Sequence, residues 1–207
     1  MDLSERLSSN FTLGELLASD RASDSAELIE QQENPPEAVV ESLRFLVETT
    51  LQPLRGMIAS PIHINSGYRC PEVNRMVGSS SRSHHLYGMA ADCRLSAGFL
   101  SDPDTLNVRS EIEELIKEKT GRVEILPLNE AGYLFALACL NLEKLEITQL
   151  VHEHGEAIGQ PAWVHIAARP DEKEGIVTFL GEKAPAHLRR VPPEDAILSL
   201  TKRPEEG

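Results

Sequence analysis

Residues 83–92, Ser-His-His-Leu-Tyr-Gly-Met-Ala-Ala-Asp, constrain the fold more than any other segment of the chain. They join a loop histidine, His85, to a carboxylate, Asp92, which lies seven positions later on a predicted strand of small residues, 88–95. The glycine between them allows the chain to turn back, so the two side chains can meet at one point. The small residues at 88, 90 and 91 also leave room for another backbone to approach closely.

A third residue of the same chemical type follows much later in the chain. The sequence Trp-Val-His-Ile at 163–166 places His165 on a predicted strand between apolar neighbours. Taken alone, His165 could be a hydrogen-bonded core histidine. With His85 and Asp92 it completes a set of two imidazoles and one carboxylate, which leaves the fourth position of a tetrahedral zinc ion open, as in catalytic zinc sites. Such ligands also accept other divalent ions.

Two further residues are candidates for chemistry beside a metal. Glu153 is the candidate general base, and the alternative is a solvated carboxylate at the end of a strand. If the strand continues past Glu153, alternation puts His152 and His154 on the opposite face from Glu153, where they could be ligands or transition-state donors. Arg69 follows a predicted strand and turn and is a candidate anion clamp, since guanidinium binds a carboxylate in a bidentate way. The alternative for Arg69 is a surface ion pair.

Composition excludes several classes of protein. The formal net charge of −13 argues against a nucleic acid or an anionic membrane surface as the main partner. The three cysteines are predicted to be reduced, packed thiols. The longest apolar stretch, 133–140, is too short to span a membrane, which takes about 20 residues. Residues 1–5 lack the pattern of a secretory signal, so we expect synthesis in the cytoplasm and a separate route to any role outside the cell.

Helical and strand periodicities alternate along the chain and predict an α+β domain over residues 1–180, followed by a tail over 181–207. Thr12 and Glu15 form a predicted capping box. The predicted helices are 11–19, Glu37 to Pro53 or a turn beyond, 71–77, 107–119, 129–140 and a short one from Pro193. The predicted strands are 61–66, 88–95, 123–126, 145–152, 163–167 and an edge strand at 176–180.

Several separated motifs together resemble the D-alanyl-D-alanine carboxypeptidase family of zinc peptidases, in the branch found in bacterial and phage cell-wall hydrolases. The likeness spans about residues 10–168. It is carried by Asn-Phe-Thr-Leu-Gly-Glu-Leu at 10–16, Asn-Pro-Pro at 34–36, Leu-Gln-Pro-Leu-Arg at 51–55, Ser-Gly-Tyr-Arg at 66–69, Asn74, Gly78, the pattern Ser-x-His-x-x-Gly-x-Ala-x-Asp at 83–92, and Trp-Val-His at 163–165.

The resemblance implies a hedgehog-like or D-Ala-D-Ala-peptidase-like fold, in which an antiparallel sheet is flanked by helices. It also implies roles for single residues, matched position by position. These are His85, Asp92 and His165 as zinc ligands, Arg69 and Ser83 as substrate-binding residues, and Glu153 as the general base, because it occupies the acid of a Gln-Leu-Ile-x-Glu motif.

The implied reaction is the hydrolysis of peptide bonds in peptidoglycan stem peptides, with the D-Ala-D-Ala bond as the first expectation. Many relatives carry an acid three residues before the last histidine, where this chain has Ala162, and His84 replaces a more usual glutamine or small residue. Two alternatives therefore stay open. One is a zinc-containing binding or structural module without catalysis, and the other is an endopeptidase that cuts between L-Ala and D-Glu.

Overall fold

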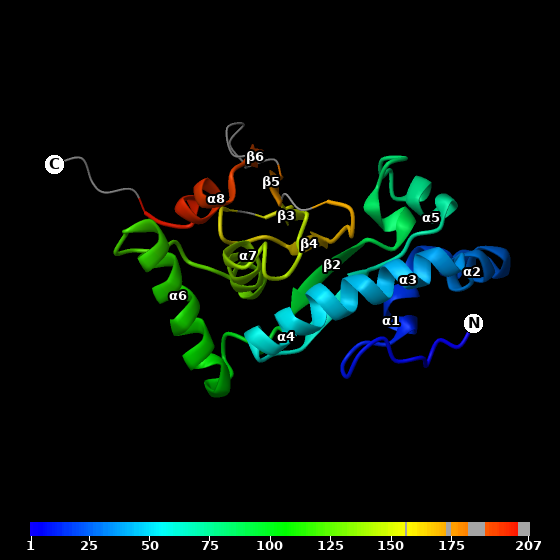
Figure 1. Ribbon diagram of the computed structural model, residues 1–207, viewed down its shortest axis with the longest axis horizontal. Coiled ribbons are helices and arrows are strands. Elements are labelled where there is room, and N and C mark those ends of the chain that lie inside the picture. Colours follow the sequence, from blue (N-terminus) through cyan, green and yellow to red (C-terminus); the bar gives the residue numbers. More distant parts are fainter. Residues whose placement is uncertain (156, 173–174, 182–188, 203–207) are drawn as a thin grey trace.

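A six-stranded sheet forms the centre of the computed structural model, which describes residues 1–155, 157–172, 175–181 and 189–202 (Figure 1). The strand order is β1-β2-β4-β3-β5-β6. Mixed helices and strands of this kind confirm the predicted α+β class. The strands are β1 (Ile62–Ser66), β2 (Ala90–Leu95), β3 (Gln149–Glu153), β4 (Trp163–Ala167), β5 (Ile176–Leu180) and β6 (Arg190–Val191).

One pair of strands corrects the expectation of a purely antiparallel sheet. β1, β2, β4 and β3 pair antiparallel, but β3 and β5 run parallel. Both edges of β4 are already paired, with β2 and with β3. The next strand in the chain, β5, therefore pairs with the remaining edge of β3. Since β5 runs opposite to β4, it has the same direction as β3, and the sheet is mixed.

The predicted helices are present, and their caps explain where they begin. They are α1 (Leu13–Leu17), α3 (Glu37–Leu46), α4 (Gln52–Ile58), α5 (Pro71–Met76), α6 (Leu106–Thr120), α7 (Glu130–Leu140) and α8 (Pro193–Ser199). The Thr12 capping box is confirmed, since Thr12 Oγ1 accepts from the Glu15 amide and the Glu15 carboxylate accepts from the Thr12 amide at 2.7 Å.

The helix that starts after Pro36 continues to Ile58 as one rod beneath the sheet (Figure 1). Its two α-helical parts are joined by a π-helical turn, Val47–Leu51, in which the Gln52 amide bonds to the Val47 carbonyl. Pro53 has no amide hydrogen to donate and follows directly, so the wider turn accommodates the missing bond. The proline therefore does not end the helix.

A helix that sequence patterns did not reveal, α2 (Ala26–Glu33), begins at a Ser25 cap. Its buried Gln32 donates to the carbonyls of Leu17 and Tyr68, at 2.8 and 2.7 Å, and accepts from the Cys70 amide at 2.9 Å. All three partners are backbone groups that would otherwise be buried without bonds. Gln32 therefore holds the turn after β1, which carries Arg69, against α1 and α2.

The segment 123–126, predicted as a strand, is not one. It forms a single isolated bridge from Ile125 to Thr201 and lies beside the described end of the chain, with Leu126 bonded to Leu200. Gly121 ends α6 in the left-handed region, and Pro127 cannot donate a ladder bond, so too few residues remain for a strand.

The proposed boundary at residue 180 stays a prediction. Of the predicted tail, the structure describes residue 181 and residues 189–202, of which β6 pairs with β5 and α8 packs against α6 and α7. The remainder lies outside the described residues. The three cysteines are buried and free, as predicted. In the described parts of the chain, helices fall short of the length and apolar character that crossing a membrane requires.

Candidate active site

Strand alternation separates the two faces of the sheet into a core face and a polar face. On the core face, α7 packs against β2, β3 and β4. The polar face carries Asp92, His165, Gln149 and Glu153. Asp92 on β2 pairs with His165 on β4, so the two share a face. His165 also pairs with Val151 on β3, and Gln149 and Glu153 lie two residues to either side of Val151, on the same face. Three adjacent strands thus place these polar groups on the same side.

His85 reaches this face from a short 3-10 turn, η3 (His84–Tyr87), that precedes β2. Gly88 ends the turn with φ of 69°, a conformation that favours glycine. An added Cβ at Gly88 would lie 2.6 Å from the Val39 carbonyl oxygen, so the turn can pack this closely on α3 only with glycine. This contact brings the buried His85 ring over β2.

His85, Asp92 and His165 form a cluster of three buried side chains that could hold a metal ion. Asp92 Oδ1 lies 3.0 Å from His165 Nδ1 and 3.2 Å from His85 Nε2, and the two ring nitrogens are 3.1 Å apart. Ligand atoms of a tetrahedral zinc ion with bonds near 2.05 Å are about 3.3 Å apart. The triangle therefore has nearly the size that such an ion requires.

In each histidine ring, one nitrogen faces the cluster and the other, outer nitrogen faces away from it. The hydrogen bond of the outer nitrogen shows which of the two carries the hydrogen. His85 Nδ1 donates to the Gly67 carbonyl at 2.6 Å, and His165 Nε2 donates to Gln149 Oε1 at 3.1 Å. A neutral imidazole has a single N–H, so the inner nitrogens are acceptors. Three acceptor atoms converge without a hydrogen between them, which a cation would stabilise.

The ionisation of the cluster also suits a metal. Burial lowers the pKa of His85, which keeps that ring neutral. Burial alone raises the pKa of Asp92, but its polar contacts with His165 and His85 outweigh burial and leave the pKa well below its usual range. Neutral imidazole and ionised carboxylate are the forms that coordinate metals.

A family model described as Peptidase M15 matches residues 10–117, slightly more than half of the chain. The chain belongs to the M15 peptidase family. M15 peptidases are zinc-dependent hydrolases, which agrees with the presence of a cluster that could hold a metal ion. The matched stretch includes His85 and Asp92, whereas His165 lies beyond it. No curated protein matches the chain.

Arg69 of this M15 peptidase forms an ion pair with Asp92 rather than lying free at the surface. Its NH2 group contacts Asp92 Oδ2, and its Nε donates to Ser66 Oγ at 2.7 Å. The side chain is 14% exposed. A guanidinium has five N–H bonds, and these two contacts use two of them, so the remainder can still meet an anion. Arg69 thus lies beside the cluster and is bonded to it.

Glu153 lies on the polar face of β3, two residues beyond Val151, which pairs with His165. Diagonal neighbours of this kind are about 7–8 Å apart. Trp163 Nε1 donates to Glu153 Oε2 at 2.8 Å and orients the carboxylate. Burial, followed by the negative charge of Asp92, raises the pKa of Glu153. The carboxylate therefore lies near the cluster and binds a proton more readily than a solvated glutamate.

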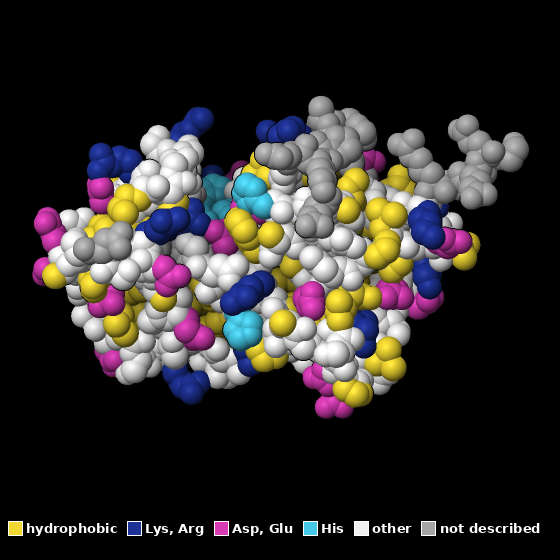
Figure 2. Space-filling model, turned by 180° about the vertical axis from the view of Figure 1, so that it is seen from behind, with side chains coloured by type: hydrophobic (Ala, Val, Ile, Leu, Met, Phe, Trp, Pro, Cys, Tyr) yellow, Lys and Arg dark blue, Asp and Glu magenta, His cyan; other side chains and the backbone are white. Residues whose placement is uncertain are grey.

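The other predicted site residue, Ser83, is half-buried at the start of η3, two positions before His85. It precedes the turn without capping it through its side chain. Its neighbour His84 is half-buried and lies outside the cluster, whereas His85 belongs to it. Figure 2 shows histidine side chains set back in a hollow of this face of the molecule.

His152 belongs to the core and is not part of the site. Its ring packs against Phe135 and Phe179, with centroids 5.2 and 5.0 Å away, and its Nε2 accepts from the Gly159 amide at 3.1 Å. His154, at the end of β3, has φ of 50°, lies beside the Trp163 ring and is 3.9 Å from the Glu153 carboxylate. Alternation thus separates His152 from the polar face, as predicted.

The burial of His152 predicts an acid-sensitive stability. Burial lowers its pKa from 6.5 to about 4, so between these values the unfolded chain binds a proton that the folded chain does not. The free energy of unfolding is expected to fall as the pH drops from 6.5 to 4, by up to about 3 kcal/mol from this residue. Urea unfolding at several pH values, with chelator present throughout, measures this change.

His152→Gln is the matched variant, because glutamine can accept from the Gly159 amide but does not titrate in this range. Its unfolding free energy should depend less steeply on pH than that of the unmodified protein. Equal slopes for the two proteins would contradict the assignment.

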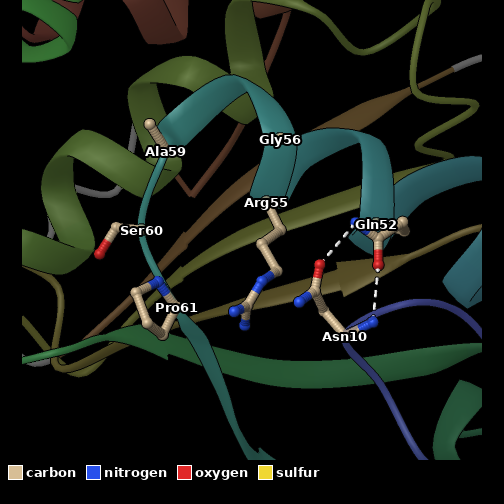
Figure 3. Close-up of a pocket in the computed structure, with 7 residues that line it drawn as sticks. All are labelled: Asn10, Gln52, Arg55, Gly56, Ala59, Ser60 and Pro61. Carbon is tan, nitrogen blue, oxygen red and sulfur yellow. Dashed lines mark hydrogen bonds between the residues drawn. The ribbon is translucent and has the colours of Figure 1, made fainter.

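A second pocket, of about 240 Å³, lies at the other end of β1 (Figure 3). Gln52 Nε2 donates to Asn10 Oδ1 at 3.1 Å, and Gln52 Oε1 accepts from the Asn10 amide at 3.2 Å, while the Arg55 guanidinium lies 5.9 Å from the centre of the Phe11 ring. These contacts join the motifs at 10–16 and 51–55. They anchor the N-terminal segment to α4, and the lining residues include neither histidine nor carboxylate.

Two supporting residues were missed from sequence, Gln149 and Gln32. Gln149 lies in the same motif as Glu153, which is a signal that could have drawn attention to it. Gln32 lies in an unremarkable polar stretch without such a signal. Its role depends on backbone groups from two distant segments.

Proposed function

We propose that this M15 peptidase is a zinc D,D-carboxypeptidase that hydrolyses the D-Ala-D-Ala bond of peptidoglycan stem peptides. The observation that carries the proposal is the convergence of three acceptor atoms, from His85, Asp92 and His165, within 3.2 Å of one another. Family membership supports the metal and the class of reaction. The bond that is cut follows from the resemblance in the motifs and from the position of Arg69.

His85, Asp92 and His165 would hold the zinc ion. When bound there, zinc polarises a carbonyl group and lowers the pKa of a water molecule toward about 7. Glu153 takes a proton from the attacking water on its carboxylate and transfers it to the leaving amine. Its raised pKa suits both steps, and the Trp163 bond limits its rotation. Glu153 thereby does the work for which many relatives have an acid at the position of Ala162.

The substrate would be oriented by its terminal carboxylate. Arg69 contacts the cluster through Asp92, and its planar N–H groups suit a carboxylate. Ser83 would donate or accept one further bond from the edge of η3. A single local arginine is sufficient to bind an acidic peptide end despite the net charge of −13. We also assign the hedgehog-like fold to residues 1–180 as part of this proposal.

The test is a set of defined stem peptides incubated with the zinc-loaded protein, with products identified by mass. Release of one D-Ala from a pentapeptide that ends in D-Ala-D-Ala is the expected result. Cleavage between L-Ala and D-Glu instead would show an endopeptidase. One bound zinc per chain without cleavage of any peptide would show a binding or structural module. Either of the last two outcomes would overturn the proposed carboxypeptidase.

A further inference from the structure

We infer that Gln149 is a positioning residue that fixes the tautomer of His165 and so prepares its Nδ1 atom for the metal. This inference rests on the proposed zinc site and names a residue outside the predicted ligand set. The decisive contact is the 3.1 Å bond from His165 Nε2 to Gln149 Oε1.

Gln149 can make this contact because of the strand register. It opens β3 opposite Ala167, two residues before Val151, the partner of His165, and so lies on the polar face beside His165. Glu153 lies on the same face beyond the other side of Val151. His165 is therefore flanked by two polar residues of β3. Gln149 contacts its outer nitrogen, Nε2, and Glu153 is the proposed general base.

The hydrogen-bond chemistry decides which nitrogen carries the proton. With the proton on Nδ1, His165 would donate to Asp92 Oδ1 at 3.0 Å, and its Nδ1 atom would have no lone pair to offer a metal in the cluster. Its Nε2 would then be an acceptor that faces another acceptor, Gln149 Oε1. With the proton on Nε2 this conflict disappears, so Gln149 favours the tautomer that can bind a metal.

The corresponding contact at His85 uses a backbone acceptor, the Gly67 carbonyl. That group cannot be removed by changing a side chain, and an added Cβ at Gly67 would lie 2.3 Å from the Leu16 carbonyl oxygen. The acceptor for His165 is a side chain. Of these two hydrogen-bond acceptors, Gln149 is therefore the one that a substitution can remove.

The experiment compares zinc dissociation constants, measured by competition with a chromophoric chelator, in the full-length protein and three variants. Gln149→Leu is expected to bind zinc about 10–100-fold more weakly, because such outer partners contribute that much to metal affinity. Gln149→Glu keeps an acceptor and should bind within a few-fold of the unmodified protein or more tightly. Gln31→Leu, which changes an exposed glutamine on α2, is the control and should bind normally.

Two further measurements complement the zinc affinities, one on the unmodified protein and one on the Gln149→Leu variant. The nitrogen shifts of His165 in the zinc-loaded protein are expected to show hydrogen on Nε2, and unfolding of Gln149→Leu in excess chelator should match the unmodified protein. Normal zinc affinity in Gln149→Leu, or equal weakening in the Leu and Glu variants, would overturn the role of Gln149 while leaving the zinc site intact. Absence of zinc binding by the unmodified protein would instead overturn the proposed function.

Discussion

Glu153→Gln is expected to lower kcat/KM for the D-Ala-D-Ala substrate by about 10²–10⁴-fold and to leave one zinc bound per chain. The amide has nearly the same shape as the carboxylate, and its oxygen can still accept from Trp163 Nε1. It cannot take a proton from water at neutral pH. Because Glu153 lies outside the His85, Asp92 and His165 cluster, metal affinity should not change. Peptide cleavage and metal content measured on the same sample test both parts.

The control for this prediction is Glu118→Gln, which removes an exposed carboxylate on α6 and should cleave normally. The pH profile provides a further check. Because burial raises the pKa of Glu153, kcat/KM should fall as the pH drops through a value above 4.5. Normal cleavage by Glu153→Gln would show that another group is the base.

Removal of the metal is expected to have the largest effect on stability. A ligand that binds only the folded state adds about 4 kcal/mol at a concentration a thousand times its Kd. Excess chelator should therefore lower the free energy of unfolding by about that amount relative to zinc at this concentration. The physical reason is that the three ligand atoms lie within 3.2 Å of one another only in the folded chain, so chelation removes binding free energy from the folded state alone.

His165→Ala separates this effect from general damage to the fold. The variant should bind no zinc and should have the same unfolding free energy with zinc and with chelator. His63→Ala, at an exposed position on β1, should respond to zinc as the unmodified protein does. An unmodified protein whose unfolding is insensitive to chelator would show that the cluster does not hold a metal.

Local patterns in the sequence predicted most elements because they depend on neighbouring residues. The Thr12 capping box and the proline before Glu37 mark helix starts through bonds and dihedral angles within a few positions. The spacing of His85 and Asp92 was equally local, and it predicted that the two side chains would meet. Segment 123–126 shows the limit of this reasoning, since Ile125 forms a single bridge without a ladder and Val123 is exposed.

What the sequence by itself determined was the set of candidate residues and the faces on which alternation puts them. Only the tertiary structure decided which of them meet. The pairing of β2 with β4 brings Asp92 beside His165, and the pairing of β4 with β3 adds Gln149 and Glu153. These contacts depend on register between paired residues that are 73 positions apart for Asp92 and His165 and 14 positions apart for Val151 and His165. Register follows from the packing of whole faces, which no short stretch of sequence contains.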